Sequence, residues 1–148
     1  MMKFVAIIMA LLFVGAILPT DAKITAIDVA WAKAVLPGME ILINDSEVVS
    51  AAANNPYISM VQIACNKTKE DIISAKAINQ AMPVSRDMQP AKDDYTSGLS
   101  SLWAGMDNVS TGYATGDHAK IKLGGSEIKM CDVYFGKINT DIGIAKAT

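Results

Sequence analysis

Apolar residues recur every three or four positions from about residue 23 to the end of the chain, and this spacing limits the fold more than any other feature. Side chains three and four residues apart lie on one face of an α-helix, whereas a half-buried strand alternates apolar and polar residues. No stretch of useful length shows that alternation. The sequence therefore predicts an all-α protein.

Breaks at proline, glycine and asparagine divide the pattern into four helical segments, at about 23–53, 56–81, 90–115 and 117–145. Pro37 falls inside the first segment, where a proline ring removes a helix hydrogen bond. We expect either one kinked helix or two short helices there. The connections between segments are short, which favours antiparallel neighbours in an up-down four-helix bundle.

The third segment carries a row of small residues spaced seven apart, which are Ala91, Gly98, Gly105 and Gly112. Glycine costs a helix interior about 1 kcal/mol relative to alanine, so something must pack closely on this row. The favoured interpretation is the close approach of a second helix. The alternative is a groove for a flat or chain-like apolar ligand, for which the candidate binding residues are Tyr95, Gly98, Leu102 and Gly105.

The first 22 residues have the features of a cleavable secretory signal peptide. A charged start at Lys3 precedes the unbroken apolar run 4–18, and Pro19 leads to small residues before a cleavage point after Ala22. A membrane span needs about 20 apolar residues, so an uncleaved anchor is the less favoured alternative. We predict a secreted or cell-surface protein with a single domain at 23–148, which contacts the membrane only if the signal sequence is retained.

Two cysteines, Cys65 and Cys131, fall on the core-facing rows of the second and fourth helices. An even number in an exported chain favours a disulfide. Those helices lie diagonally in a square bundle, and a disulfide needs Cα atoms within about 7 Å. The alternatives are a flattened bundle with the disulfide or two free thiols. Three N-x-S/T tripeptides make Asn44, Asn66 and Asn108 candidate glycosylation acceptors if the host modifies exported chains.

Residues suited to catalysis or metal binding are sparse. The single histidine, His118, lies at the start of the fourth helix, and the four glutamates form no E-x-x-H motif. A net charge of −2 and a single arginine, without a basic patch, disfavour nucleic-acid binding. We therefore expect a non-enzyme without a cofactor, whose partner is an unknown protein or cell-surface component.

The stretch 82–95, MPVSRDMQPAKDDY, resembles a run in small exported helical proteins of methanogenic archaea. In those proteins P-V-S-x-x-L-x-P-A-K-x-x-Y opens a long helix after a helical hairpin, and Met88 stands here where that run has leucine. The resemblance extends from about Asn54 to the C-terminus, although only this run is specific. It implies the same bundle topology and no catalytic residue.

These observations together predict an exported, non-catalytic binding module built on a helical bundle. The alternative function is that of a carrier, with a small apolar ligand held along the Ala91–Gly112 row.

Overall fold

The computed structural model describes residues 24–54 and 57–147, and within this part of the chain every regular element is helical. The helices are α2 (Ala26–Ala53), α3 (Ile58–Ala81), α4 (Gln89–Thr115) and α5 (His118–Ala147), and a short 3-10 helix, η2 (Arg86–Met88), precedes α4. In α5 the side chains are described as far as Ile138 and at Asp141. The four predicted helical segments are confirmed. The predicted signal peptide lies outside the described residues.

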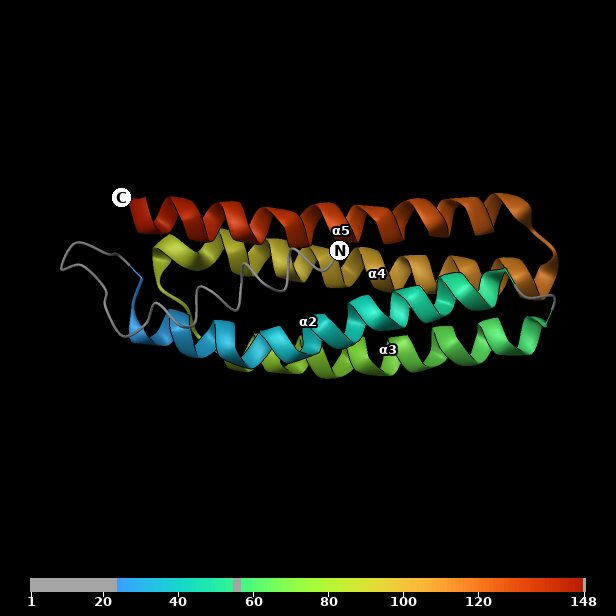
Figure 1. Cartoon of the computed structure of the whole chain (residues 1–148), viewed down its shortest axis with the longest axis horizontal. Coiled ribbons are helices and arrows are strands. Elements are labelled where there is room, and N and C mark those ends of the chain that lie inside the picture. The colour runs from blue at the N-terminus through green and yellow to red at the C-terminus, as the bar shows by residue number, and fades with distance from the viewer. Residues whose placement is uncertain (1–23, 55–56, 148) are drawn as a thin grey trace.

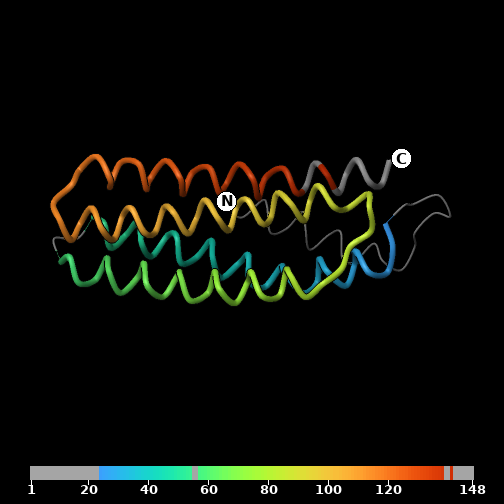
Figure 2. The backbone as a smooth tube through the Cα atoms, turned by 180° about the vertical axis from the view of Figure 1, so that it is seen from behind, coloured from blue at the N-terminus to red at the C-terminus, as the bar shows by residue number. Residues whose placement is uncertain are grey.

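The helices run alternately up and down along one long axis (Figure 1). α3 packs against both α2 and α4, and the most extensive contact in the bundle is between α4 and α5. The view from behind shows the same order, with α4 between α5 and the α2–α3 pair (Figure 2). The predicted all-α, up-down four-helix bundle is therefore confirmed.

α2 is one continuous helix, although Pro37 lies inside it. The proline ring removes the N–H that would bond to the carbonyl of Lys33 and crowds the preceding turn. The helix changes direction part-way along its length in Figure 1, as expected where a proline interrupts the hydrogen-bond ladder. Of the two alternatives for this segment, the single kinked helix is the one observed.

The start of α2 is tied to the connection before η2 through the buried Asp28. One carboxylate oxygen, Oδ2, accepts hydrogen bonds from the backbone N–H of Thr25 at 2.8 Å and from its hydroxyl at 2.6 Å. The other oxygen, Oδ1, accepts the backbone N–H of Ser85 at 2.7 Å. This one side chain therefore fixes both the first turn of α2 and the entry into α4.

Three aromatic rings from different helices form the centre of the core. Trp31 of α2 meets Tyr95 of α4 edge-on, with ring centroids 6.2 Å apart, and Tyr95 stacks on Phe135 of α5 at 5.6 Å. All three are buried. The indole N–H of Trp31 donates to Oδ1 of Asn79 on α3 at 2.8 Å, and Nδ2 of Asn79 donates to the hydroxyl of Thr96 on α4 at 2.9 Å. A polar chain therefore crosses α2, α3 and α4 beside the aromatic core.

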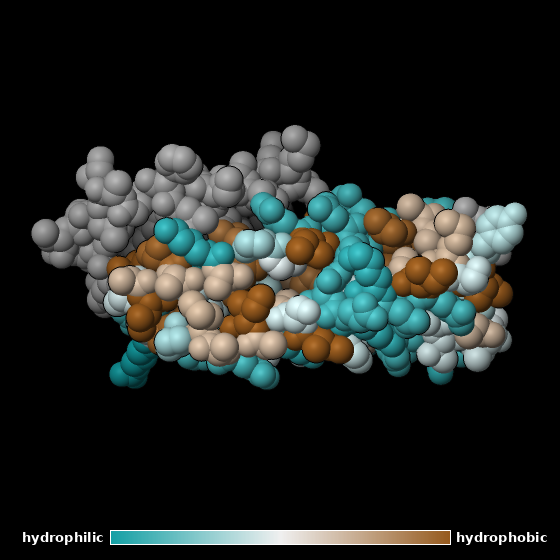
Figure 3. Space-filling model, turned by 90° about the horizontal axis from the view of Figure 1, so that it is seen from below, coloured by the Kyte–Doolittle hydropathy of each residue, from teal (hydrophilic) through white to brown (hydrophobic). Residues whose placement is uncertain are grey.

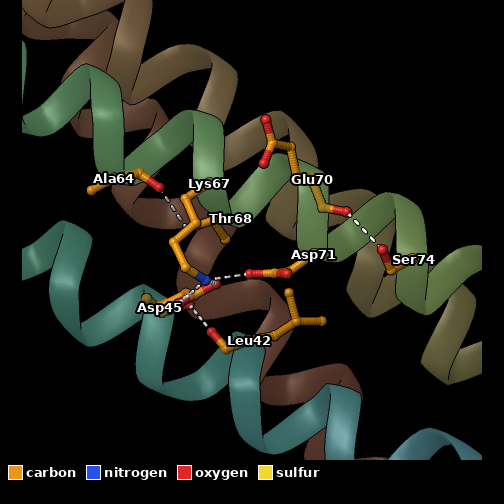
Figure 4. A network of polar contacts seen from close by, with 9 residues as sticks. Leu42, Asp45, Ala64, Lys67, Thr68, Glu70, Asp71 and Ser74 are labelled. Carbon is orange, nitrogen blue, oxygen red and sulfur yellow. Dashed lines mark hydrogen bonds and ion pairs between the residues drawn. The ribbon is translucent and has the colours of Figure 1, made fainter.

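A second polar contact joins α2 and α3 nearer their connection (Figure 4). The ammonium of Lys67 lies 3.3 Å from Oδ1 of the mostly buried Asp45 and 2.6 Å from Oδ2 of Asp71, one turn further along α3. Burial raises the pKa of Asp45, and the neighbouring carboxylate of Asp71 raises it further, while Lys67 opposes both effects. The ammonium therefore holds two acidic side chains close together at the α2–α3 contact.

Candidate functional site

The small-residue row of α4 is a contact with α5. A Cβ added to Gly98 would lie 2.5 Å from a ring carbon of Phe135. One added to Gly105 would lie 3.0 Å from the carbonyl oxygen of Gly124, and one added to Gly112 2.9 Å from the carbonyl oxygen of Asp117. The interpretation of this row as a close helix approach is therefore confirmed, and only residues without a side chain allow the two backbones to come so near.

The ligand groove predicted along this row is not found there, because α5 occupies the space. Tyr95 is completely buried and stacked on Phe135, and Gly98 and Gly105 face α5 directly. Of the four candidate binding residues, only Leu102 lines a cavity. The carrier site along the Ala91–Gly112 row is therefore withdrawn.

A different groove lies between α2 and α5, which do not pack against each other. In an ideal up-down bundle the first and last helices pack together, yet α2 and α5 make at most minor contact here. The space between them is about 380 Å³, and α4 forms its floor. We call it the α2–α5 groove. Its principal apolar lining residues are Leu42, Val49, Leu102, Val109, Ile128 and Phe135.

Polar groups lie along the rims of this groove. The α2 rim carries Ser46, Glu47 and Ser50, and the α5 rim carries Lys129 and Asp132. Partial burial raises the pKa of the Asp132 carboxyl. None of these three charged residues forms an ion pair with another described residue. The site is thus an apolar trough with an incomplete ring of polar groups, which is the usual composition of a small-molecule site.

The far end of the groove is fixed by a hydrogen bond. The hydroxyl of Tyr113, on α4, donates to the carbonyl oxygen of Ala53 at the end of α2, at 2.6 Å. Gly125 lines the α5 wall, and a Cβ placed on it would meet nothing within 4 Å. The groove therefore has a tethered end near Tyr113 and unfilled space beside Gly125.

Both cysteines are free, buried thiols in the structure, in place of the predicted disulfide. Cys65 lies on α3 and Cys131 on α5, with α4 between these two helices, and this separation is that of the diagonal arrangement rather than of a flattened bundle. Burial raises the pKa of Cys65 to about 11 and that of Cys131 to about 12. Cys131 lines the α2–α5 groove, but as a protonated thiol it is a poor nucleophile at neutral pH.

The three glycosylation candidates all lie in helices, and their surroundings differ. Asn44 on α2 and Asn66 on α3 are exposed. Asn108 on α4 is partly buried, and its side-chain nitrogen donates to Oε2 of Glu127 at 2.8 Å. The amide nitrogen of Asn108 is therefore occupied in the folded protein, whereas modification at the other two remains a prediction.

The described residues give no support for a metal or acid–base centre. No group of three or more histidine, cysteine, aspartate or glutamate side chains in residues 24–54 and 57–141 has metal-binding geometry. His118 is exposed at the start of α5. Asp141 of α5 has its pKa raised by burial and by the nearby carboxylate of Asp94 on α4, but this pair lies outside the α2–α5 groove. The groove is therefore the strongest candidate site in this part of the chain.

Large apolar side chains are also exposed on the α2–α3 side of the bundle (Figure 3). Ile63 is 69% exposed and Ile73 57%, and Ile41 and Val48 project from α2. Figure 3 shows hydrophilic side chains between the apolar groups on this side of the bundle. Exposed apolar side chains that form one contiguous patch are typical of contact surfaces, whereas single ones are common on any protein surface. The sequence did not locate these exposed apolar side chains. Periodic spacing identifies the face of a helix that is buried, but it does not show whether the opposite face is covered or exposed.

Comparisons with protein-family models, with curated proteins and with solved structures find nothing that matches this chain. The resemblance to exported proteins of methanogenic archaea therefore stays a prediction. Among the described helices, none has an apolar stretch long enough to cross a membrane.

Proposed function

We propose that the protein is an exported, non-catalytic binding protein that holds a small, largely apolar ligand in the α2–α5 groove. The observation that supports this is the open side of the bundle, with its volume of about 380 Å³ and its mainly apolar lining. Ligand pockets commonly have volumes of about 300–1,000 Å³ and a few polar groups at the edge. A ligand there would remove from water the apolar surface of the partly exposed lining residues Ile43, Ile121 and Ile128, because the other principal apolar lining residues are already buried.

The absence of reactive partners within the groove supports a binding role over catalysis. Its titratable side chains are Glu47, Tyr113, Lys129, Cys131 and Asp132. The hydroxyl of Tyr113 is committed to Ala53, and the thiol of Cys131 is kept protonated by burial. No two of the five are hydrogen-bonded to each other in the described structure, so no general acid–base or nucleophile–base pair is assembled.

The test adds a larger side chain to a residue of the groove wall, so that the side chain occupies the space of the ligand. Gly125→Leu adds a side chain at a lining position of α5 where the Cβ itself meets nothing within 4 Å. We expect it to weaken binding of a neutral, environment-sensitive fluorescent dye by about tenfold or more, equivalent to about 1.4 kcal/mol. The matched control is Ser126→Leu, which adds the same side chain at the next, exposed position.

The two outcomes separate clearly. Dye binding that is lost in Gly125→Leu and kept in Ser126→Leu supports the groove as the site. Binding that is equal in both variants and in the parent protein would place the dye elsewhere and overturn the proposal. Far-ultraviolet circular dichroism of all three proteins checks that helix content is unchanged.

A further inference from the structure

The charged groups of the α2–α5 groove lie at about the same level along the bundle. α2 and α5 run antiparallel, so residues late in α2 lie level with residues early in α5 (Figure 1). The lining residues run from 42 to 53 on α2 and from 121 to 135 on α5. Glu47 on one wall therefore falls near the level of Lys129 and Asp132 on the other. Beyond this level the walls continue towards Ile121 and Ala53, where the lining is mainly apolar and the hydroxyl of Tyr113 is already bonded.

The groove is elongated along the helices, because its lining residues extend over several turns of α2 and α5. At 1.5 Å of rise per residue, the helix between Asp132 and Ile121 covers about 16 Å. On this stretch the space beside Gly125 is open, and the floor is formed by Val109 and Leu102 of α4. This shape accommodates an extended hydrocarbon chain of about a dozen carbons better than a compact ring system, because a chain contacts the floor and both walls along its length.

The charged side chains at this level of the groove favour a positively charged ligand group. Two carboxylates face the groove from opposite walls, Glu47 and Asp132, against the single ammonium of Lys129. Glu47, Lys129 and Asp132 are all exposed, so what favours a cation is the charge balance of two carboxylates against one ammonium. A cation placed beside Asp132 favours the charged form of this carboxyl, whose pKa is raised by desolvation.

We infer that the ligand of the α2–α5 groove is a linear amphiphile with a positively charged head, seated between Glu47 and Asp132 with its chain lying along α4 towards Ile121. This inference rests on the proposed function and adds the charge and shape of the ligand to it. Binding removes the chain from water, and the two carboxylates select the head.

The experiment compares three twelve-carbon probes below their micelle concentrations on the folded protein. They are dodecyltrimethylammonium, dodecanol and dodecanoate, and binding is measured by displacement of the neutral dye. We expect the cation to bind about tenfold or more tightly than the anion, with the alcohol between them. The double variant Glu47→Gln with Asp132→Asn should bring the cation and anion to within about threefold of each other and leave the alcohol unchanged. The control Glu40→Gln removes a negative charge from α2 outside the groove and should preserve the tenfold preference.

The results distinguish failure of this inference from failure of the proposed function. An anion that binds as tightly as the cation, or a preference that survives in the double variant, would overturn the cationic head while leaving the groove in place. If Glu40→Gln reduces the preference for the cation as much as the double variant does, the cation is attracted by the net charge of the protein alone. That result would also overturn the cationic head. If the alcohol fails to displace the dye, or if its binding is unaffected by Gly125→Leu, the groove is not the site and both proposals are wrong.

Discussion

Two adjacent glycines on α5, Gly124 and Gly125, differ in how closely other atoms surround them. Adding one methyl group at each position tests this difference. A Cβ on Gly124 would lie 2.7 Å from the carbonyl oxygen of Gly105 and 2.8 Å from the backbone nitrogen of Val109. A Cβ on Gly125 would meet nothing within 4 Å. The backbone of α4 cannot move aside as a flexible side chain does, so the first position excludes a methyl group and the second admits one.

We predict that Gly124→Ala destabilises the protein and Gly125→Ala stabilises it. Alanine favours a helix interior over glycine by about 1 kcal/mol, and this gain should appear at Gly125. At Gly124 the steric conflict should exceed that gain and lower the free energy of unfolding by about 1–3 kcal/mol. Urea unfolding followed by circular dichroism measures both. Stabilisation by both substitutions would show that α4 and α5 are further apart than described.

The carboxylate of Asp28 makes a pH-dependent contribution to stability. Burial acts to raise its pKa, but the hydrogen bonds from Thr25 and Ser85 outweigh burial and lower it below the ordinary value of 3.8. A carboxyl whose pKa is lowered on folding stabilises the protein above its unfolded-state pKa, and this contribution is lost as the pH falls through the folded-state value.

We therefore predict that Asp28→Asn costs about 0.5–2 kcal/mol at pH 7, the usual range for losing a helix cap. The difference from the parent protein should shrink as the pH falls below about 3.8, where Asp28 of the unfolded chain becomes protonated while the folded protein still holds the charge. Urea unfolding at pH 7 and at pH 3 measures this. A difference that is constant between these values would show that the charge of Asp28 contributes nothing.

At the scale of elements, the contact between Trp31 and Asn79 is predicted to couple α2 to α3. Asn79→Ala leaves the buried indole N–H without its acceptor, which should cost about 1–3 kcal/mol. Trp31→Phe removes that N–H, so adding Asn79→Ala to Trp31→Phe should cost less than it does alone. A double-mutant cycle from urea unfolding gives the coupling energy. Strict additivity would contradict the hydrogen bond.

The position of α4 between α3 and α5 leads to a prediction about the thiols. Both cysteines are free, and burial raises the pKa of Cys65 to about 11 and of Cys131 to about 12. We expect a disulfide-exchange reagent at pH 8 to react with neither thiol in the folded protein and with both in denaturant without reductant. An absence of reactive thiols in denaturant would mean that the cysteines had been paired. The variants Cys65→Ser and Cys131→Ser would then show which partner each had.

The sequence predicted elements and close contacts better than it predicted the open side of the bundle. The heptad row ending at Gly112 requires a close neighbour, because three glycines weaken a helix that nothing contacts, and α5 is that neighbour. The position of Pro37 likewise predicted an interruption, either a kink or a break into two helices, and the structure has the kink. The α2–α5 groove left no comparable signal, because Leu42, Val49 and Ile128 have the same periodic spacing whether their helices meet or stay apart. Similarly, the core-facing rows of Cys65 and Cys131 indicated burial but not which helix lies between them.

At the scale of the whole molecule, packing is uneven across the bundle. α4 contacts α3 and α5 along its length, and its buried residues extend from Ala91 to Gly112. The second half of α2, by contrast, has the open groove on one side and α3 on the other. Local opening is easiest where few apolar contacts must be broken. The bundle should therefore open first along α2.

Native-state hydrogen exchange tests this order, and we predict that amides in 42–53 exchange about tenfold or more faster than amides in 98–112, a difference of about 1.4 kcal/mol in opening free energy. Gly125→Leu should slow exchange in 42–53, because the added side chain gives this half of α2 a surface to pack on across the groove. The same slowing on addition of dodecyltrimethylammonium would show that ligand binding closes the same side of the bundle. Equal exchange in the two segments would mean that the α4–α5 contact and the α2 wall open together, and exchange that is faster in 98–112 would place the weak point of the fold at the glycine row.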